Sequence, residues 1–184
     1  MTTTTTRTQL LTRLIDGPCG PLTIVGSSAG LRAILWHADS LTRAGLGGIE
    51  LCPGSVEAVD EAARQLGEYF DGARKTFDLT LDLRGTAFQI EAWQALAEIP
   101  FGETRTYAEQ AARLGNPAAV RAVGAANGRN PLSIVLPCHR VVGSDGALRG
   151  FAGGLAAKSA LLDFERAHLD RPGETCLVAA PAPT

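Results

Sequence analysis

The sequence predicts two joined parts: an α/β N-terminal domain made of a small sheet plus one helix, and a mostly helical C-terminal domain with a helix-turn-helix. Three observations predict this fold class. β-rich runs flank a turn early in the chain, polar and apolar residues alternate near residue 80, and later apolar residues recur at helical spacing. We expect the domains to span residues 10–84 and 85–169, with a disordered Thr-rich leader at 1–9 and a flexible tail at 170–184.

The N-terminal domain is predicted to begin with a β-hairpin. Residues 20–37, GPLTIVGSSAGLRAILWH, contain two β-rich runs around a Ser-Ser-Ala-Gly turn. Residues 75–84, KTFDLTLDLR, alternate apolar and polar side chains, which is typical of a half-buried strand. Between them a helix is predicted over residues 56–70, with Ser55 as its N-cap and apolar residues at helical spacing: Val56, Val59, Ala63, Leu66 and Phe70.

A helix over residues 88–99 opens the C-terminal domain. Pro100 ends this helix, because proline cannot continue the hydrogen-bond ladder. The residues that mark its apolar face are Phe88, Ala92, Leu96 and Ile99.

Two further helices follow almost without a break. Thr106 and Glu109 form a capping box, which opens a helix that closes at Gly115. Asn116 then caps a second helix with Pro117 at its first position. Two helices joined by so few residues are typical of a helix-turn-helix.

The second of these helices, residues 117–128, has an unusually bare outer face. Its inner face carries Val120, Val123 and Asn127, and its outer face carries Ala118, Arg121, Ala122 and Ala125. A helix that reads bases in the major groove presents several polar side chains, whereas small residues allow close approach to a groove and a lone arginine can enter the base stack. The alternative is that the alanines pack on another helix and Arg121 is a solvated charge.

Composition and charge exclude several classes of protein. The 184 residues are 45% hydrophobic, which is too apolar for a disordered chain. No apolar run approaches the roughly 20 residues of a membrane helix, and the N-terminus does not resemble a signal peptide. The net charge is −2, and residues 85–168 carry 8 basic and 7 acidic groups. Any binding to nucleic acid would therefore depend on shape and a few placed residues.

The cysteines predict neither a zinc site nor a disulfide framework. They are widely scattered and show neither CxxC spacing nor paired histidines. The four are Cys19, Cys52, Cys138 and Cys176.

Cys138 and His139 stand side by side in IVLPCHRVVG, residues 134–143. A thiol becomes a nucleophile when its thiolate is populated, and an adjacent imidazole can take its proton directly or through a water. Neighbouring side chains on an extended segment point to opposite faces, so a turn or a bridging water is required. The alternative is that Cys138 is a small core residue.

Glu165 is the candidate partner of the imidazole. An imidazole acting as a base needs a carboxylate to fix its tautomer. Glu165 lies on the apolar stripe of a predicted helix over residues 155–169, together with Leu155, Leu162 and Leu169. A carboxylate on that side is costly unless it has a partner, and the alternative is a Glu at the edge of the stripe that reaches water.

Four segments together resemble the O6-alkylguanine-DNA alkyltransferase family, also called methylated-DNA–protein-cysteine methyltransferases. The resemblance is strong over residues 76–168 and looser over 16–75. It implies a ribonuclease-H-like N-terminal domain and a C-terminal helix-turn-helix used in the minor groove. The segments are PFGETRTYAEQAA, GNPAAVRAVGAANGRNP, NPLSIVLPCHRVVGSDG and FAGGLAAKSALLDFE.

The resemblance implies a role for each catalytic candidate. Cys138 attacks the alkyl carbon on O6 of guanine and remains alkylated, so that each molecule reacts once. His139 takes the thiol proton through a water, and Glu165 orients His139. Tyr107 resembles the tyrosine whose hydroxyl donates to the guanine ring, and Asn130 resembles the asparagine that hydrogen-bonds within the active-site turn.

The implied partner is double-stranded DNA that carries O6-alkylguanine, with O4-alkylthymine as a second candidate substrate. Arg121 resembles the finger that fills the base stack after the nucleotide flips, and three small residues match those that line the groove: Ala119, Ala122 and Gly124. No cofactor, metal, membrane or obligate protein partner is expected. We expect a monomer in the cytoplasm of a bacterium, associated with its nucleoid.

The sequence departs from some relatives at two points. Phe151 and Ala152 stand where those relatives have a tyrosine and a serine, which bears on the range of alkyl groups accepted. Some relatives bind zinc through N-terminal Cys and His residues, but Cys19 and Cys52 lack matching histidines.

Two rival functions use parts of the same pattern. A Cys-His hydrolase would use the same nucleophile and base, but no oxyanion-hole motif is visible and the helix-turn-helix would be unexplained. A DNA-binding regulator or an inactive lesion sensor would use the helix-turn-helix alone. The nucleophile with both partners counts against the sensor, and the bare helix counts against a sequence-specific regulator.

Overall fold

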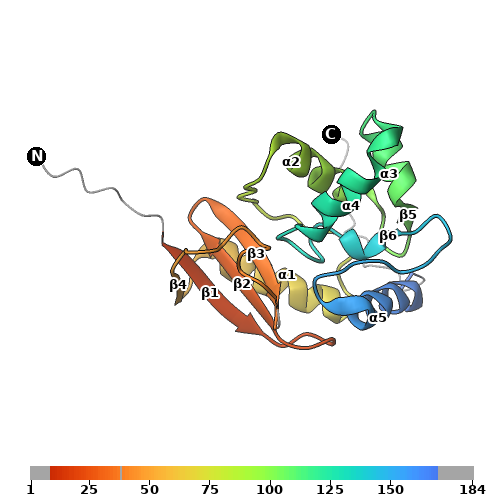
Figure 1. The fold of residues 1–184 in the computed structure, drawn as a ribbon. Coiled ribbons are helices and arrows are strands. Elements are labelled where there is room, and N and C mark those ends of the chain that lie inside the picture. The colour runs from red at the N-terminus through yellow and green to blue at the C-terminus, as the bar shows by residue number, and fades with distance from the viewer. Residues whose placement is uncertain (1–8, 38, 170–184) are drawn as a thin grey trace, which may run out of the picture.

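The computed structural model describes residues 9–37 and 39–169 (Figure 1). The predicted flexible tail and all but one residue of the predicted leader therefore lie outside the described residues, as does Cys176. A four-stranded sheet with one covering helix occupies one side of Figure 1, and the helices of the C-terminal half occupy the other. The predicted fold class, an α/β part followed by a mostly helical part, is confirmed.

The sheet is built around the predicted hairpin. Strands β2 (Leu22–Ser27) and β3 (Gly30–Trp36) pair antiparallel, and β1 (Leu10–Ile15) pairs with β2 on its other side. The short β4 (Leu51–Pro53) runs parallel to β1 and gives the order β3-β2-β1-β4. The turn between β2 and β3 requires Gly30, which has φ of +133° and whose Cβ would lie 2.7 Å from the carbonyl oxygen of Thr80.

The strand predicted over residues 75–84 is wrong, although its alternating burial is right. Only Leu81 forms a bridge, with Leu31 of β3, while the apolar residues of the segment pack on the core. The backbone of Asp78 is held by a side chain instead: the Gln65 amide donates to its carbonyl at 2.7 Å and accepts from its N–H at 2.9 Å. This pairing with a side chain of α1 keeps the segment extended without a regular ladder.

Helix α1 (Glu57–Phe70) covers the sheet where the sequence predicts it. Its N-cap is Val56, with no side-chain cap, so the prediction of Ser55 as the N-cap is wrong. Ser55 lies one residue too early, and its hydroxyl bonds the Asp60 carboxylate, which also accepts from Arg13 of β1 at 2.8 Å.

The C-terminal half begins with helix α2 (Ala87–Gln94), whose last predicted turn tightens into the 3₁₀ turn η1 (Ala95–Glu98). A capping box between Thr86 and Gln89, which was not predicted, starts α2. After η1 the chain forms a two-residue strand, β5 (Arg105–Thr106), which pairs in parallel with β6 (Val141–Val142).

The helix-turn-helix is present. Helix α3 (Tyr107–Arg113) has the predicted capping box of Thr106 and Glu109, and Gly115 follows it with φ of +73°. The second helix starts differently from the prediction, because Pro117 opens the 3₁₀ turn η2 (Pro117–Ala119) before α4 (Val120–Gly128). Asn116 makes no side-chain cap bond.

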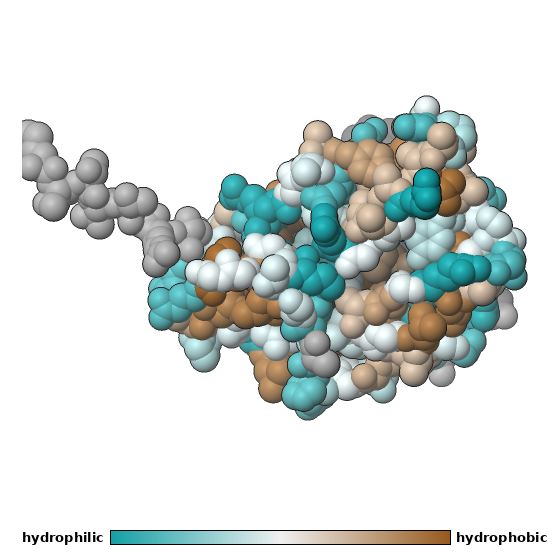
Figure 2. All heavy atoms as spheres, in the orientation of Figure 1, coloured by the Kyte–Doolittle hydropathy of each residue, from teal (hydrophilic) through white to brown (hydrophobic). Residues whose placement is uncertain are grey.

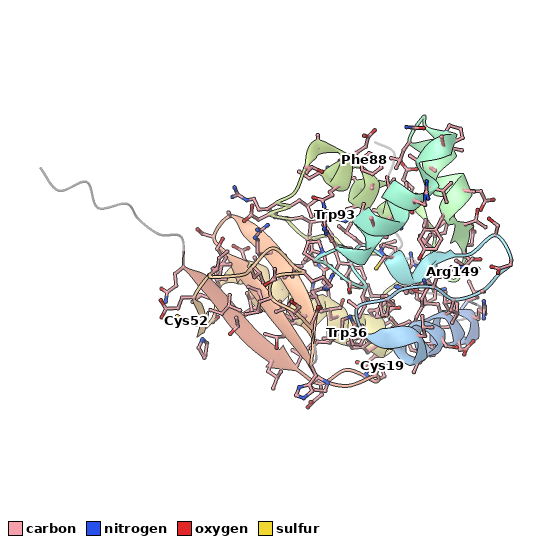
Figure 3. All side chains as sticks on the ribbon, in the orientation of Figure 1. Cys19, Trp36, Cys52, Phe88, Trp93 and Arg149 are labelled. Atoms are coloured by element: carbon pink, nitrogen blue, oxygen red, sulfur yellow. The ribbon has the colours of Figure 1, made fainter. Side chains whose placement is uncertain are left out.

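Buried hydrogen bonds between polar groups hold the two helices of the helix-turn-helix together and attach them to α2. Gln110 of α3 and Asn127 of α4 exchange amide hydrogen bonds, with 2.7 Å from Asn127 Nδ2 to Gln110 Oε1. Trp93 reaches from α2 toward α4 (Figure 3), and its indole N–H donates to the carbonyl of Ala126 at 2.8 Å. The helix that carries Arg121 is therefore held rigidly on the core.

Helix α5 (Gly154–Ala167) ends the described chain, after the 3₁₀ turn η3 (Cys138–Arg140) and β6. The predicted stripe is only partly right: Leu162 and Glu165 are buried, whereas Leu155 and Leu169 are 49% and 45% exposed. The buried face is instead completed by other residues of the helix: Ala157, Lys158 and Leu161.

The predicted domains share one main core. It joins residues of the sheet and α1, such as Leu22 and Leu66, to Leu96 and Leu161 of the C-terminal half. The backbone is also joined across the halves, because the N–H of Ile34 donates to the carbonyl of Pro131 at 2.8 Å. Over the residues that the structure describes, the helices lack the length and apolarity needed to cross a membrane.

Candidate active site and DNA-binding surface

Cys138 begins the turn η3, so Cys138 and His139 lie on a turn and not on an extended strand. The sequence requires such a turn, or a bridging water, for the two side chains to cooperate. The preceding loop is strained at Ile134, which has φ of +75°, a conformation that a β-branched residue rarely adopts. Both side chains are buried: Cys138 is 6% exposed and His139 is 0% exposed.

Asn130 braces the loop that leads to Cys138. Its side-chain amide donates to the carbonyl of Leu136 at 2.7 Å and accepts from the N–H of Leu132 at 3.0 Å. It also makes a hydrogen bond with the Cys138 thiol, which favours the thiolate. From the N-terminal half, Arg43 donates to the carbonyl of Asn130 at 2.8 Å.

The predicted pairing of His139 with Glu165 is present in the structure. His139 Nε2 lies 2.8 Å from Glu165 Oε1, and both side chains are fully buried. The other ring nitrogen, Nδ1, is also buried and has no hydrogen-bond partner among the described residues. Because an ionised carboxylate only accepts, Nε2 carries the proton and Nδ1 has a free lone pair.

Arg140, which was not predicted to have a role, completes the pairing. Its guanidinium donates to Glu165 through Nε at 2.9 Å to Oε2 and through NH2 at 2.8 Å to Oε1. A third bond goes from NH1 to the carbonyl of Ile99 at 2.6 Å. This fork neutralises the buried carboxylate, and its position directly after His139 in the PCHR segment was the available signal.

Two further donors reach Glu165 from outside the predicted site. The hydroxyl of Tyr69, at the end of α1, donates to Oε1 at 2.8 Å. The backbone N–H of Gly102 donates to Oε2 at 2.9 Å. No sequence spacing links Tyr69 to Glu165, so only the fold brings them together.

Burial sets the resting protonation states of the nucleophile and the base. Burial raises the pKa of the Cys138 thiol, and Asn130 and the Lys158 charge offset this only in part. Burial likewise lowers the pKa of His139, although Glu165 acts in the opposite direction. At neutral pH the site therefore holds a thiol beside a neutral imidazole, which is the arrangement that general-base activation requires.

Glu165 remains ionised in this setting. Burial by itself would raise the pKa of Glu165, but hydrogen bonds from His139 and Arg140 outweigh it and lower the pKa to about 2. The carboxylate therefore holds the imidazole without competing for its proton.

Tyr107, the first residue of α3, is half-buried, and its hydroxyl donates to the carbonyl of Arg149 at 3.1 Å. Burial and the nearby Cys138 both raise its pKa, so Tyr107 remains a proton donor. Lys158 is the unexpected neighbour: it is fully buried, and its ammonium donates to the carbonyls of Val141 at 2.6 Å and Arg149 at 2.7 Å. These bonds hold the loop before α5 against the turn of Cys138.

A cavity of about 590 Å³ opens beside Tyr107. Helix α4 forms one wall, and the loop between β6 and α5, which carries Arg149 in Figure 3, forms the other. At Gly124 an added Cβ would already touch the Tyr107 ring at 4.0 Å, so a larger side chain would crowd the opening. The lining residues are Tyr107, Val120, Arg121, Gly124, Gly143, Ser144, Asp145, Arg149 and Gly150.

The outer face of α4 matches the sequence expectation. Arg121 and Ala122 are exposed, and Ala119 and Gly124 are half-buried. In the space-filling view, pale and light-brown residues lie over the region of α3 and α4, with a few polar side chains between them (Figure 2). A surface of this kind can approach a groove closely.

Phe151 and Ala152 lie just before α5. The ring of Phe151 packs edge-on against Trp36 of β3, with 5.5 Å between centroids, and against His139 at 6.3 Å. Phe151 therefore helps to exclude water from the imidazole. No group of three or more His, Cys, Asp or Glu residues that could hold a metal occurs within residues 9–37 and 39–169.

Comparison with protein families gives two matches, which together span most of the chain. Residues 10–83 match the model described as 6-O-methylguanine DNA methyltransferase, ribonuclease-like domain. Residues 87–167 match the model described as 6-O-methylguanine DNA methyltransferase, DNA binding domain.

The chain is also similar to individual proteins of this family in sequence and in structure. The chain is 48% identical over 159 residues to the methylated-DNA–protein-cysteine methyltransferase of Methanosarcina barkeri, covering 85% of this chain and 97% of that protein. It is 46% identical over 156 residues to the enzyme of the same name from Mycolicibacterium paratuberculosis, covering 85% and 92%. Among solved structures, Mycobacterium tuberculosis OGT in complex with DNA matches with a TM-score of 0.78 and 44% identity, covering 86% and 94%.

The Glu165 network predicts a specific pH dependence of stability. Replacing Glu165 with Gln leaves the Arg140 guanidinium buried without its counter-ion, which we expect to cost about 3–5 kcal/mol at pH 7. The pKa of Glu165 is about 2 in the folded protein and about 4.3 in an unfolded chain. The contribution of the Glu165 carboxylate to the free energy of unfolding is therefore fully present above the pKa of the unfolded chain. It is lost as the pH falls from that pKa toward the pKa of the folded protein.

Urea unfolding of the wild type and Glu165→Gln at pH 7 and pH 3 measures this effect. The difference in unfolding free energy between the two proteins should narrow at pH 3. Asp163→Asn, which removes an exposed acid from the same helix, should change stability by no more than about 0.5 kcal/mol. A Glu165→Gln protein as stable as the wild type at pH 7 would contradict the network.

Proposed function

This chain belongs to the 6-O-methylguanine DNA methyltransferase family, and from that premise we propose that it repairs DNA by transferring the alkyl group of O6-alkylguanine to Cys138. One observation carries the assignment of Cys138 and His139. His139 is buried directly after Cys138, its Nε2 is engaged by Glu165, and its Nδ1 has no partner among the described residues. That nitrogen is available to accept the thiol proton through a water.

The proposed reaction is an in-line displacement at the alkyl carbon. A bond forms between the Cys138 sulfur and that carbon as the bond from the carbon to O6 of guanine breaks. The thiol proton passes through a water to Nδ1 of His139, and Glu165 stabilises the resulting imidazolium. The guanine leaves with the electron pair as an anion, which the Tyr107 hydroxyl stabilises by donating a hydrogen bond to its ring. The anion then takes a proton from solvent, and the His139 imidazolium returns one to solvent.

Each molecule acts once under this proposal. The product is a thioether, which has no acidic proton and no good leaving group, so His139 cannot regenerate the thiol. The chemistry requires neither a cofactor nor a metal. O4-alkylthymine, which carries its alkyl group on an equivalent exocyclic oxygen, is a second candidate substrate.

The damaged nucleotide has to leave the duplex, because Cys138 is buried and only 6% exposed. Extruding a base costs a few kcal/mol, which close groove contacts and an inserted side chain can offset. We assign the groove contacts to Ala119, Ala122 and Gly124 of the η2–α4 segment, in the minor groove. Arg121 would occupy the space that the base leaves.

The near-neutral charge of the protein fits this mode of binding. Residues 85–168 carry almost equal numbers of basic and acidic groups, so contacts with phosphates are few and affinity for undamaged DNA is modest. Lesions would be found through their weakened pairing and not through sequence. We propose that the protein acts as a cytoplasmic monomer on double-stranded DNA.

The proposal predicts a stoichiometric covalent change. After incubation with a short duplex that contains one O6-methylguanine, the intact mass should rise by one CH₂, because a methyl group replaces the thiol hydrogen. The gain should saturate at one per chain and be absent from Cys138→Ser. A protein that binds the duplex with no gain in mass would be a lesion sensor or a regulator, and hydrolysis of ester or amide substrates would favour the Cys-His hydrolase.

The assignment of Arg121 predicts a defect that is confined to duplex substrates. Arg121→Ala should slow transfer from an O6-methylguanine duplex about tenfold or more, because extrusion loses a contribution of a few kcal/mol. Reaction with free O6-benzylguanine, which needs no extrusion, should be unchanged.

Arg129→Ala provides the matched control, since Arg129 is an exposed arginine at the end of the same helix. Arg129→Ala removes the same charge, but Arg121 is still present to fill the gap in the base stack. The rate of transfer from the duplex should therefore be nearly unchanged. Equal losses for the two variants would show that Arg121 acts only through its charge.

A further inference from the structure

We propose that the N-terminal half supplies a positioning residue for the reaction: the hydroxyl of Tyr69 holds Glu165 and thereby sets the basicity of His139. This inference rests on the proposed function, in which His139 is the base. It gives the sheet-and-helix half of the molecule a direct part in alkyl transfer. Tyr69 does not touch the reacting atoms, so it acts only through the carboxylate.

The contact is short and fully buried. Tyr69 is 0% exposed, and its hydroxyl lies 2.8 Å from Glu165 Oε1. The same oxygen lies 2.8 Å from His139 Nε2 and 2.8 Å from Arg140 NH2. The hydroxyl of Tyr69 and the imidazole of His139 therefore share one carboxylate oxygen.

The ring of Tyr69 leaves the hydroxyl little freedom to move. Four aromatic rings from α1, the following segment, the loop after η1 and α5 surround it, with centroid distances of 5.5 to 6.0 Å: Phe70, Phe77, Phe101 and Phe164. A phenylalanine would fill the same space without a polar group to desolvate. The hydroxyl therefore requires a partner at that point, and Glu165 is the partner it has.

Sharing one oxygen links Tyr69 to the base electrostatically. A hydrogen bond from Tyr69 draws negative charge on Oε1 away from His139. Without that donor, Glu165 would hold the imidazole proton more strongly and the pKa of His139 would rise. If the pKa of His139 is higher, a larger part of the acid pH range leaves the imidazole protonated, and a protonated imidazole cannot accept the thiol proton.

The other charged groups around the imidazole stay in place when this hydroxyl is removed. These groups are Glu165 and Lys158 of α5 and Arg140 of η3. Burial first, and then Glu165, raise the pKa of Tyr69 far above its ordinary value, so its hydroxyl remains a donor throughout the working range. The thiol of Cys19, in the β1–β2 loop, faces the Tyr69 hydroxyl and acts in the same direction.

The test is the pH dependence of Tyr69→Phe. Single-turnover transfer at saturating O6-methylguanine duplex should show its acid limb moved to higher pH by about half to one unit, which is roughly a three- to tenfold slower reaction on that limb. The imidazole of His139, followed by proton NMR without DNA, should titrate at correspondingly higher pH. Affinity for undamaged duplex should be unchanged.

Phe77→Leu is the matched control, because it loosens the packing on the Tyr69 ring while keeping the hydroxyl. Equal shifts in Phe77→Leu and Tyr69→Phe would overturn the proposal, since Tyr69 would then act through packing alone. Unchanged titration of His139 in Tyr69→Phe would also overturn it. Absence of alkyl transfer in the wild type would refute the proposed function, while the NMR titration would still test the link from Tyr69 to His139.

A second measurement keeps the test open if Tyr69→Phe does not fold. The chain has two tyrosines, so growth of Tyr107→Phe with 3-fluorotyrosine labels Tyr69 alone. Fluorine makes the phenol a stronger donor and should shift the His139 titration to lower pH, opposite to Tyr69→Phe. A shift to higher pH, or none, would contradict the proposal.

Discussion

The buried carboxylate of Glu165 is the constraint on which the site depends. A fully buried carboxylate is tolerated only when its lone pairs are filled and its charge is balanced. Glu165 obtains this from four places along the chain: the end of α1, the loop after η1, and both His139 and Arg140 of η3. Each donor fixes one part of the fold relative to α5. The geometry that satisfies Glu165 is also the geometry that leaves Nδ1 of His139 facing away from the carboxylate and unpartnered among the described residues.

This convergence explains why the two halves of the chain act as one body. The sheet and α1 share a core with α2 and α5, and Ile34 joins its backbone to Pro131 just before the active-site loop. Arg43, from the loop after β3, donates to the carbonyl of Asn130, whose side chain braces the approach to Cys138. The strained backbone at Ile134 is held between these contacts. The N-terminal half thus supports the loop that carries the nucleophile.

Local patterns were sufficient to predict much of this arrangement. Thr106 with Glu109 specifies the start of α3, and a carboxylate on an apolar stripe could be matched to the imidazole of a Cys-His pair. Contacts made across the fold were not predictable, because no spacing links Tyr69 or Lys158 to the site. Errors arose where tertiary bonds replaced local ones. Gln65 holds Asp78 where a strand was expected. In the last predicted helix, Ala157 and Lys158 are buried while Leu155 and Leu169 face water.

The central claim is that Glu165 holds His139 as a neutral imidazole protonated at Nε2, so that Nδ1 can take the thiol proton. Nitrogen-15 NMR of the histidine rings, in the DNA-free protein at neutral pH, measures this state directly, and His139 can be assigned by comparison with His139→Gln. We predict that Nε2, the nitrogen that bonds Glu165, carries a proton and that Nδ1 is unprotonated. A doubly protonated ring, or a proton on Nδ1, would contradict the claim, because His139 could not then accept a proton from Cys138.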